Sequence, residues 1–308
     1  MHHILKLFLV VSTVLLLQQV VAGCGDKNKE NEPIPLVTKD TVGVVKIDTV
    51  ISQILGKNWY YRVYMPISYK QDTAAKYEIL YLLHGYSGNQ NDWCTNGTIN
   101  SIIDRLYRDS ITREFIIVMP NGMNSWYVDR QGFNDCVNME SAIITELIPQ
   151  VEAKYRVKPG PENRSIGGLS MGGFGALRLA LKYPELFTNI ILMSPACYHP
   201  QPDAGSNARN SPEFKENGVF SGAIWTSLNY PNYWSTFDVP TNKPHHFYIS
   251  AGKSDMTGIL KAFKIQLPDA LKARTEYVTW DTISFAGGHD WPVWRLGVED
   301  ALKKIYKR

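Results

Sequence analysis

Three polar residues that are far apart in the sequence have the types and order needed to activate a nucleophile. Ser170 lies in Gly168-Leu169-Ser170-Met171-Gly172, a G-x-S-x-G turn that projects a serine hydroxyl between a strand and a helix. A hydroxyl attacks a carbonyl only when a base takes its proton, and His289 follows a late strand in FAGGHDW. Asp255 follows an earlier strand, where its carboxylate would hold the imidazole in the required tautomer. Together these three residues predict acyl transfer through a serine nucleophile.

Other residues fit the base and acid roles less well. His199 lies in an irregular stretch, and His245 and His246 open a strand. Asp290 is adjacent to the histidine and can seldom reach its ring. Two alternatives stay open, a structural histidine at 289 and a surface role for Asp255. The runners-up for the acid are Asp203, Asp238 and Asp269.

The oxyanion that forms during such an attack needs preorganised donors. The backbone N–H of Met171 follows the nucleophile and is the first candidate. The second is the backbone N–H of Tyr86, in the loop that follows the strand ending in His84 and Gly85. The alternative is a His-Gly turn with no part in catalysis.

Apolar runs alternate with amphipathic stretches from about residue 41, as in an α/β protein. Residues 42–50 and 59–66 are predicted to form an antiparallel edge hairpin. Helices are predicted from apolar residues at helical spacing, with a kink or restart at Pro149. The fold predicted is a mostly parallel, doubly wound sheet with helices on both faces. Buried strands are expected at 77–85, 114–122, 164–170, 188–194, 245–252 and 277–285.

The amino terminus is typical of an exported lipoprotein. Residues 1–23 combine Lys6 with a short apolar run and are predicted to be a signal peptide. They end in VVAGC, which resembles a bacterial lipobox, so Cys24 would carry lipid; an ordinary secretory signal is the alternative. Residues 24–40 are polar and predict a flexible tether, which leaves 41–308 as one domain. The expected location is outside the cytoplasm, anchored to a bacterial membrane, with the outer membrane or cell surface favoured.

Composition excludes some other classes of function. The 308 residues carry 32 basic and 29 acidic side chains, a net charge of +3, without a long basic run, which argues against nucleic acid as a partner. Cys94, Cys136 and Cys197 allow at most one disulfide, whose pairing stays open, and their spacing is not that of a zinc site. No cofactor or metal is expected.

Four segments together resemble one family: LLHGYSGNQNDW, PNGMNSWY, GLSMGGFGALRLALKYPELF and GGHDWPVWR. They are similar to the "Putative esterase" family of α/β-hydrolases, which includes feruloyl esterases, S-formylglutathione hydrolase (esterase D), tributyrin-type esterases and the antigen 85 mycolyltransferases. The resemblance spans about residue 45 to the end. It implies an α/β-hydrolase fold and the same roles for Ser170, Asp255 and His289.

The segment at about 196–240 matches no motif of that family and is rich in aromatic and turn residues. We expect an irregular insertion that shapes a cleft for sugar or aryl groups, although packing of the insertion on itself explains the pattern as well. The candidate substrate-binding residues are Trp93, Trp126, Tyr127, Trp225 and Trp234, with Tyr198, Tyr230 and Tyr233 nearby.

The sequence therefore predicts a serine esterase that forms an acyl-enzyme. Feruloyl or acetyl esters of plant cell-wall xylan are the expected substrates. Three enzymatic alternatives are an S-formylglutathione hydrolase, a short-chain esterase and an acyltransferase to a sugar. An inactive carbohydrate-binding lipoprotein is the alternative outside catalysis.

Overall fold

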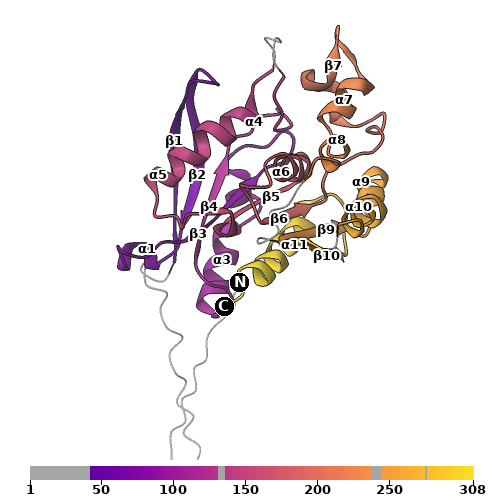
Figure 1. Ribbon diagram of the computed structural model, residues 1–308. Helices are drawn as coiled ribbons and strands as arrows, with labels where there is room; N and C mark the ends of the chain where they lie inside the picture. The colour runs from indigo at the N-terminus through magenta and orange to yellow at the C-terminus, as the bar shows by residue number, and fades with distance from the viewer. Residues whose placement is uncertain (1–41, 131–135, 238–243, 275) are drawn as a thin grey trace, which may run out of the picture. The chain divides into compact units, whose positions relative to one another are not determined.

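The strongest apolar runs form one mixed sheet. The computed structural model describes residues 42–130, 136–237, 244–274 and 276–308. Within these ranges, eight strands pair in the order β1-β2-β4-β3-β5-β6-β9-β10 (Figure 1). Their bounds are β1 Val44–Ser52, β2 Lys57–Met65, β3 Glu78–Leu83, β4 Phe115–Pro120, β5 Arg164–Leu169, β6 Asn189–Met193, β9 His245–Gly252 and β10 Val278–Phe285.

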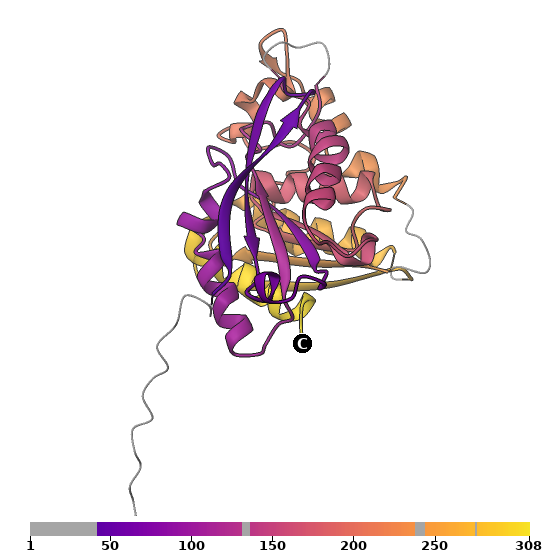
Figure 2. The ribbon, with the colours of Figure 1, turned by 90° about the vertical axis from the view of Figure 1, so that its left-hand side faces the viewer.

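The predicted edge hairpin is confirmed. β1 pairs antiparallel with β2, β2 pairs antiparallel with β4, and the pairs from β4 through β10 are parallel. Figure 2 shows the hairpin as two long twisted strands at one edge of the sheet. The carboxyl ends of β5, β9 and β10 consequently lie at the same end of the parallel strands. Loops that carry functional groups gather at this end in α/β proteins.

Alternation along the strands divides the core in two, with helices over both faces. In β3, Ile79, Tyr81 and Leu83 face one cluster, and Leu80 and Leu82 face the other. The first cluster lies under α5, α6 and α10, and the second under α3 and α11. These helices span α3 Ile99–Arg108, α5 Ile148–Lys154, α6 Met171–Lys182, α10 Leu267–Lys272 and α11 Trp291–Ile305.

Pro149 changes the helix that carries it, as the sequence predicts. Proline has no N–H to donate to the carbonyl four residues earlier. The chain runs from α4 (Met139–Ser141) through a π-helical stretch at Ala142–Leu147 into α5, where Pro149 occupies the first turn. A widened turn therefore takes the place of a sharp break. The remaining short helices are α1 Ser68–Gln71, α2 Asp92–Thr95, a 3₁₀ turn at Pro161–Asn163, α9 Thr257–Lys261 and a π turn at Ala262–Gln266.

The segment expected to be irregular contains short regular elements. Ser221 caps α7, and Pro231 opens α8, two local signals that start helices. The elements are 3₁₀ turns at Asn207–Asn210 and Pro212–Phe214, β7 Lys215–Glu216, β8 Val219–Phe220, α7 Gly222–Leu228 and α8 Pro231–Trp234.

A buried cation joins this segment to α6. Arg178 is 1% exposed, pairs with Glu140, and donates to the carbonyl of Leu228 and the hydroxyl of Tyr233, both at 2.9 Å. Because a buried charge must be paired and hydrogen-bonded, these contacts fix the segment against α6, the helix that follows Ser170.

The predicted signal peptide, tether and lipidation site Cys24 lie outside the described residues. Within the described part of the chain, no helix is long and apolar enough to cross a membrane. Cys94 and Cys197 are free thiols in this structure.

Candidate active site

Ser170 occupies a strained turn between β5 and α6. Its backbone angles are φ 52° and ψ −116°, in a region that costs roughly 1–3 kcal/mol for a residue with a side chain. Neighbouring backbone segments approach closely: a Cβ on Gly168 would lie 2.5 Å from the carbonyl of Gly172, and one on Gly172 would lie 2.6 Å from the carbonyl oxygen of Leu83. Glycine is therefore required at both positions.

The structure brings the three predicted residues together. His289 Nε2 lies 2.9 Å from Ser170 Oγ, and His289 Nδ1 lies 2.9 Å from Asp255 Oδ1. Asp255 comes from the loop after β9, and His289 comes from the loop after β10. The ring nitrogen Nδ1 of His289 is bound by Asp255 and not by the runners-up Asp203 or Asp269, and Asp269 is paired with Lys272. Asp290, which was expected to be too close in sequence to reach the ring, caps α11 by accepting from the N–H of Val293. Asp238 lies outside the described residues.

The Asp255 carboxylate is buried and yet held in its charged form. Burial alone would raise its pKa, but the hydrogen bond and charge of His289, a contribution from Ser194 and the N–H of Met256 outweigh it and lower the pKa. Trp294 donates its indole N–H to Ser194 at 3.1 Å and lies edge-on to the His289 ring. These contacts hold Asp255 in place, and Asp255 in turn orients the ring of His289.

The loop containing Tyr86 lies directly beside Ser170. A Cβ on Gly85 would lie 3.6 Å from Ser170 Cβ, so the predicted oxyanion donors at Tyr86 and Met171 are on segments that meet at the serine. His84 supports this loop from inside: burial lowers its pKa to about 4, so the ring is neutral at pH 7. Its Nε2 accepts from the N–H of Gly122, which assigns the proton to Nδ1 and a hydrogen bond to the carbonyl of Gly85.

Ser170 and His289 open into a cavity of about 520 Å³, a size suited to a small organic group. Aromatic side chains from four parts of the chain line it, together with the carboxylates of Asp92 and Asp290. Burial raises the pKa of Asp92. No Lys or Arg stands among the described residues of the wall, so the cavity disfavours anionic groups. The aromatic residues are Tyr86, Trp126, Tyr198, Trp291 and Trp294.

Several predicted substrate-binding residues lie elsewhere. Trp93, Tyr127 and Trp225 are at most 1% exposed and belong to the core, so the expectation that they line the cleft is corrected. Trp234 lines a different cavity. Of the five candidates, Trp126 alone borders the serine. Trp291 and Trp294, which also line the cavity, were not among the predicted residues. Their position shortly after His289 in the sequence is the signal that could have identified them.

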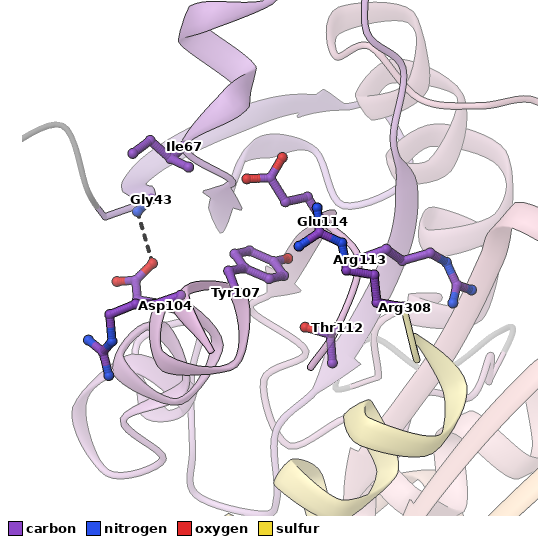
Figure 3. Close-up of a pocket in the computed structure, with 9 residues that line it drawn as sticks. Gly43, Ile67, Asp104, Tyr107, Thr112, Arg113, Glu114 and Arg308 are labelled. Carbon is purple, nitrogen blue, oxygen red and sulfur yellow. Dashed lines mark hydrogen bonds between the residues drawn. The ribbon is translucent and has the colours of Figure 1, made fainter. Parts of the chain in front are cut away.

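A further cavity of about 450 Å³ lies at the opposite ends of the parallel strands (Figure 3). Arg113 and Glu114, which precede β4, border it together with Asp104, which accepts from the N–H of Gly43 at 2.9 Å. Arg113 is held by both oxygens of Glu78. Asp104 also accepts from the hydroxyl of Tyr64, and Glu114 accepts from the hydroxyl of Ser68. These groups are engaged with their own neighbours, and we assign no chemistry to this cavity.

Comparison with known proteins agrees with the site. The family model described as "Putative esterase" matches residues 52–305. The chain belongs to this esterase family. A Xylanibacter ruminicola endo-1,4-beta-xylanase/feruloyl esterase is 32% identical over 163 residues, which are 52% of this chain and 22% of that protein. The chain therefore corresponds to only about a fifth of that relative's length.

Two other relatives match over nearly their full lengths. An acetyl esterase of Caldicellulosiruptor saccharolyticus is 26% identical over 83% of this chain and 96% of its own. A solved ferulic acid esterase superimposes with a TM-score of 0.69 at 26% identity, covering 86% of this esterase-family chain and 98% of that structure. The α/β-hydrolase fold expected from the sequence is confirmed.

Proposed function

We propose that this protein is a serine esterase that hydrolyses feruloyl or acetyl esters of plant cell-wall polysaccharide. One observation carries the proposal: the Ser170 hydroxyl, the His289 imidazole and the Asp255 carboxylate form a continuous hydrogen-bonded chain with 2.9 Å steps. The relatives named for feruloyl and acetyl ester hydrolysis support this choice of acyl groups.

The geometry supplies each step of acyl transfer. His289 Nε2 takes the proton as Ser170 Oγ attacks the ester carbonyl, and Asp255 stabilises the imidazolium. The N–H groups of Met171 and Tyr86 stabilise the oxyanion. His289 then protonates the departing alcohol, and a water molecule, activated by the same imidazole, releases the acid and restores the serine.

The cavity favours an uncharged or aryl ester over an anionic thioester. Its rings suit a planar acyl group, while Asp92 and Asp290 would repel the carboxylates of a glutathione conjugate. S-Formylglutathione is accordingly expected to be a poor substrate.

The test is a comparison of kcat/KM for methyl ferulate, acetylated xylan and S-formylglutathione, with Ser170→Ala as the control. We expect turnover of the first two and a loss of several orders of magnitude in kcat for the variant. Near-normal turnover by Ser170→Ala would exclude the mechanism, and a preference for S-formylglutathione would exclude the substrate class.

We also propose that the mature chain is tethered outside the cytoplasm through lipid on Cys24. The lipobox-like VVAGC sequence and the polar stretch up to residue 40 support this. Expression with a radiolabelled fatty acid should label the wild type and not Cys24→Ser. Equal labelling of both would disprove the anchor.

A further inference from the structure

A second cavity, of about 420 Å³, is lined in part by a residue that follows the wall of the catalytic cavity directly in the sequence. Tyr198 lines the cavity that contains Ser170, and the next residue, His199, lines the second. Consecutive residues of one segment after β6 thus contribute to both cavities. The second is lined by His199, Tyr230, Pro231, Trp234, Ser235, Gln266 and Ala270.

Trp234, the main aromatic residue of this cavity, is held in place by Phe237 and Arg274. The Trp234 indole stacks on Phe237 with ring centroids 5.7 Å apart and an interplanar angle of 26°. Arg274 donates to the carbonyls of Trp234 and Phe237, which fixes the backbone of both. Trp234 is nevertheless partly exposed, so it offers a rigid apolar platform that loses little entropy when a ligand stacks on it.

Two polar atoms on residues of this wall lack partners. Trp234 Nε1 and Gln266 Oε1 are both covered and make no hydrogen bond in the described structure. Gln266 Nε2 donates to the carbonyl of His199 at 2.8 Å, which fixes the orientation of the amide. Leaving such groups unsatisfied costs roughly 1–3 kcal/mol each, so their presence calls for an explanation. A hydroxyl group both donates and accepts, so a ligand rich in hydroxyl groups can satisfy either an amide oxygen or an indole N–H.

The charge of the wall narrows the choice of ligand. No Lys, Arg, Asp or Glu stands among the described residues that line the cavity, so no permanently charged side chain there would pair with a phosphate or a carboxylate. Tyr230, Trp234 and Pro231 supply flat apolar surface, and Ser235 and Gln266 supply hydroxyl and amide groups. This combination matches a sugar ring, which has apolar C–H faces and a rim of hydroxyls.

We propose that this second cavity is an accessory subsite for a neutral oligosaccharide, which holds the glycan that carries the ester. The inference rests on the proposed function for the identity of the glycan, and its position next to the Tyr198 segment suits a polymer that also reaches Ser170. Binding of the sugar itself needs no turnover, so the two ideas can be tested separately.

The first experiment measures binding of xylohexaose, which has no ester, to the purified full chain by calorimetry. We expect Trp234→Ala to weaken binding at least tenfold and Trp234→Phe, which keeps a ring but removes the N–H, to weaken it less. Tyr60→Ala, at an exposed aromatic residue of the edge hairpin outside both cavities, is the matched control and should bind like the wild type. Absence of wild-type binding, or equal binding by Trp234→Ala, overturns the proposal.

The second experiment measures kinetics with two substrates. For Trp234→Ala, KM should rise on feruloylated xylan, while kcat/KM for methyl ferulate stays within twofold of the wild type. Equal losses on both substrates overturn the proposal. If Trp234→Ala fails to fold, Gln266→Leu, on the other wall, takes its place with the same expectations. Ser170→Ala separates the two proposals. It should still bind xylohexaose, which tests the subsite, and it should lose esterase activity, which tests the mechanism. Retained activity in this variant would refute the mechanism and leave the subsite proposal standing.

Discussion

Gly122 donates its backbone N–H to Nε2 of the buried His84 at 2.8 Å, so a neutral imidazole joins the loop after β3 to the loop after β4. Burial lowers the pKa of His84 to about 4, below its ordinary value of 6.5. The unfolded chain therefore binds the proton first as pH falls, and the stability that His84 contributes is complete above pH 6.5 and lost toward pH 4.

We predict that the wild type loses up to about 3 kcal/mol of unfolding free energy over this interval through His84. His84→Gln, which cannot take up the proton, should be less stable at pH 7.5 and show a shallower dependence on pH. Urea denaturation at pH 7.5, 5.5 and 4.5 measures both slopes. Identical slopes would show that His84 is not the group responsible.

Asp255→Asn should lower kcat by roughly 10³–10⁴-fold with little change in KM, because an amide favours the wrong imidazole tautomer. Asp269→Asn is the control, since that carboxylate is exposed and paired with Lys272. Steady-state kinetics on methyl ferulate measures both variants. A loss of less than tenfold in Asp255→Asn would remove Asp255 from the mechanism.

Gly168→Ala should distort the turn at Ser170, because the new Cβ would lie 2.5 Å from the carbonyl of Gly172. We expect a lower Tm and a loss of labelling by a serine-directed phosphonate. Gly205→Ala is the matched control: a Cβ there meets nothing within 4 Å, so its stability should stay within about 0.5 kcal/mol of the wild type. Equal Tm values for the two variants would contradict the close packing.

Glu213 is 3% exposed, Oε2 finds no partner among the described residues, and burial raises its pKa to about 7. Because the folded pKa exceeds the ordinary 4.5, the folded state binds the proton more tightly, and stability falls as pH rises from 4.5 to 7. Glu213→Gln should therefore stabilise the protein by up to about 3 kcal/mol at pH 8 and much less at pH 5. Glu216→Gln, at an exposed site, should change little at either pH. A gain independent of pH would argue against titration of Glu213.

Trp291 lines the catalytic cavity and packs edge-on against Trp93 and Trp294 at 5.4 and 5.3 Å. Trp291→Ala should lower kcat/KM for methyl ferulate by about 10–100-fold, because an aryl group loses its apolar wall. The value for an alkyl acetate, which is too small to fill the cavity, should change less than threefold. Parallel losses on both esters would indicate a general disturbance of the site.

The sequence predicted those parts of the site that depend on local chemistry. A nucleophile turn, a histidine after a late strand and an acid after the preceding strand each leave a short signal at Ser170, His289 and Asp255. The aromatic walls depend on packing between distant segments, and composition does not distinguish a core tryptophan such as Trp225 from a wall tryptophan such as Trp294. Pro149 predicts a disturbance of its helix, but the form of that disturbance, a π-helical stretch before the proline, depends on tertiary packing.

The buried Arg178 also has a consequence for engineering. Its guanidinium is bound by Glu140, by the carbonyl of Leu228 and by the hydroxyl of Tyr233. The segment at about 196–240 and α6 therefore depend on each other for these contacts. Grafting the corresponding segment from a relative without the acceptors at 228 and 233 would leave Arg178 paired with Glu140 alone, with its other N–H groups buried and unsatisfied. Chimeras that exchange this segment to change specificity should therefore also exchange the residues at positions 178 and 140.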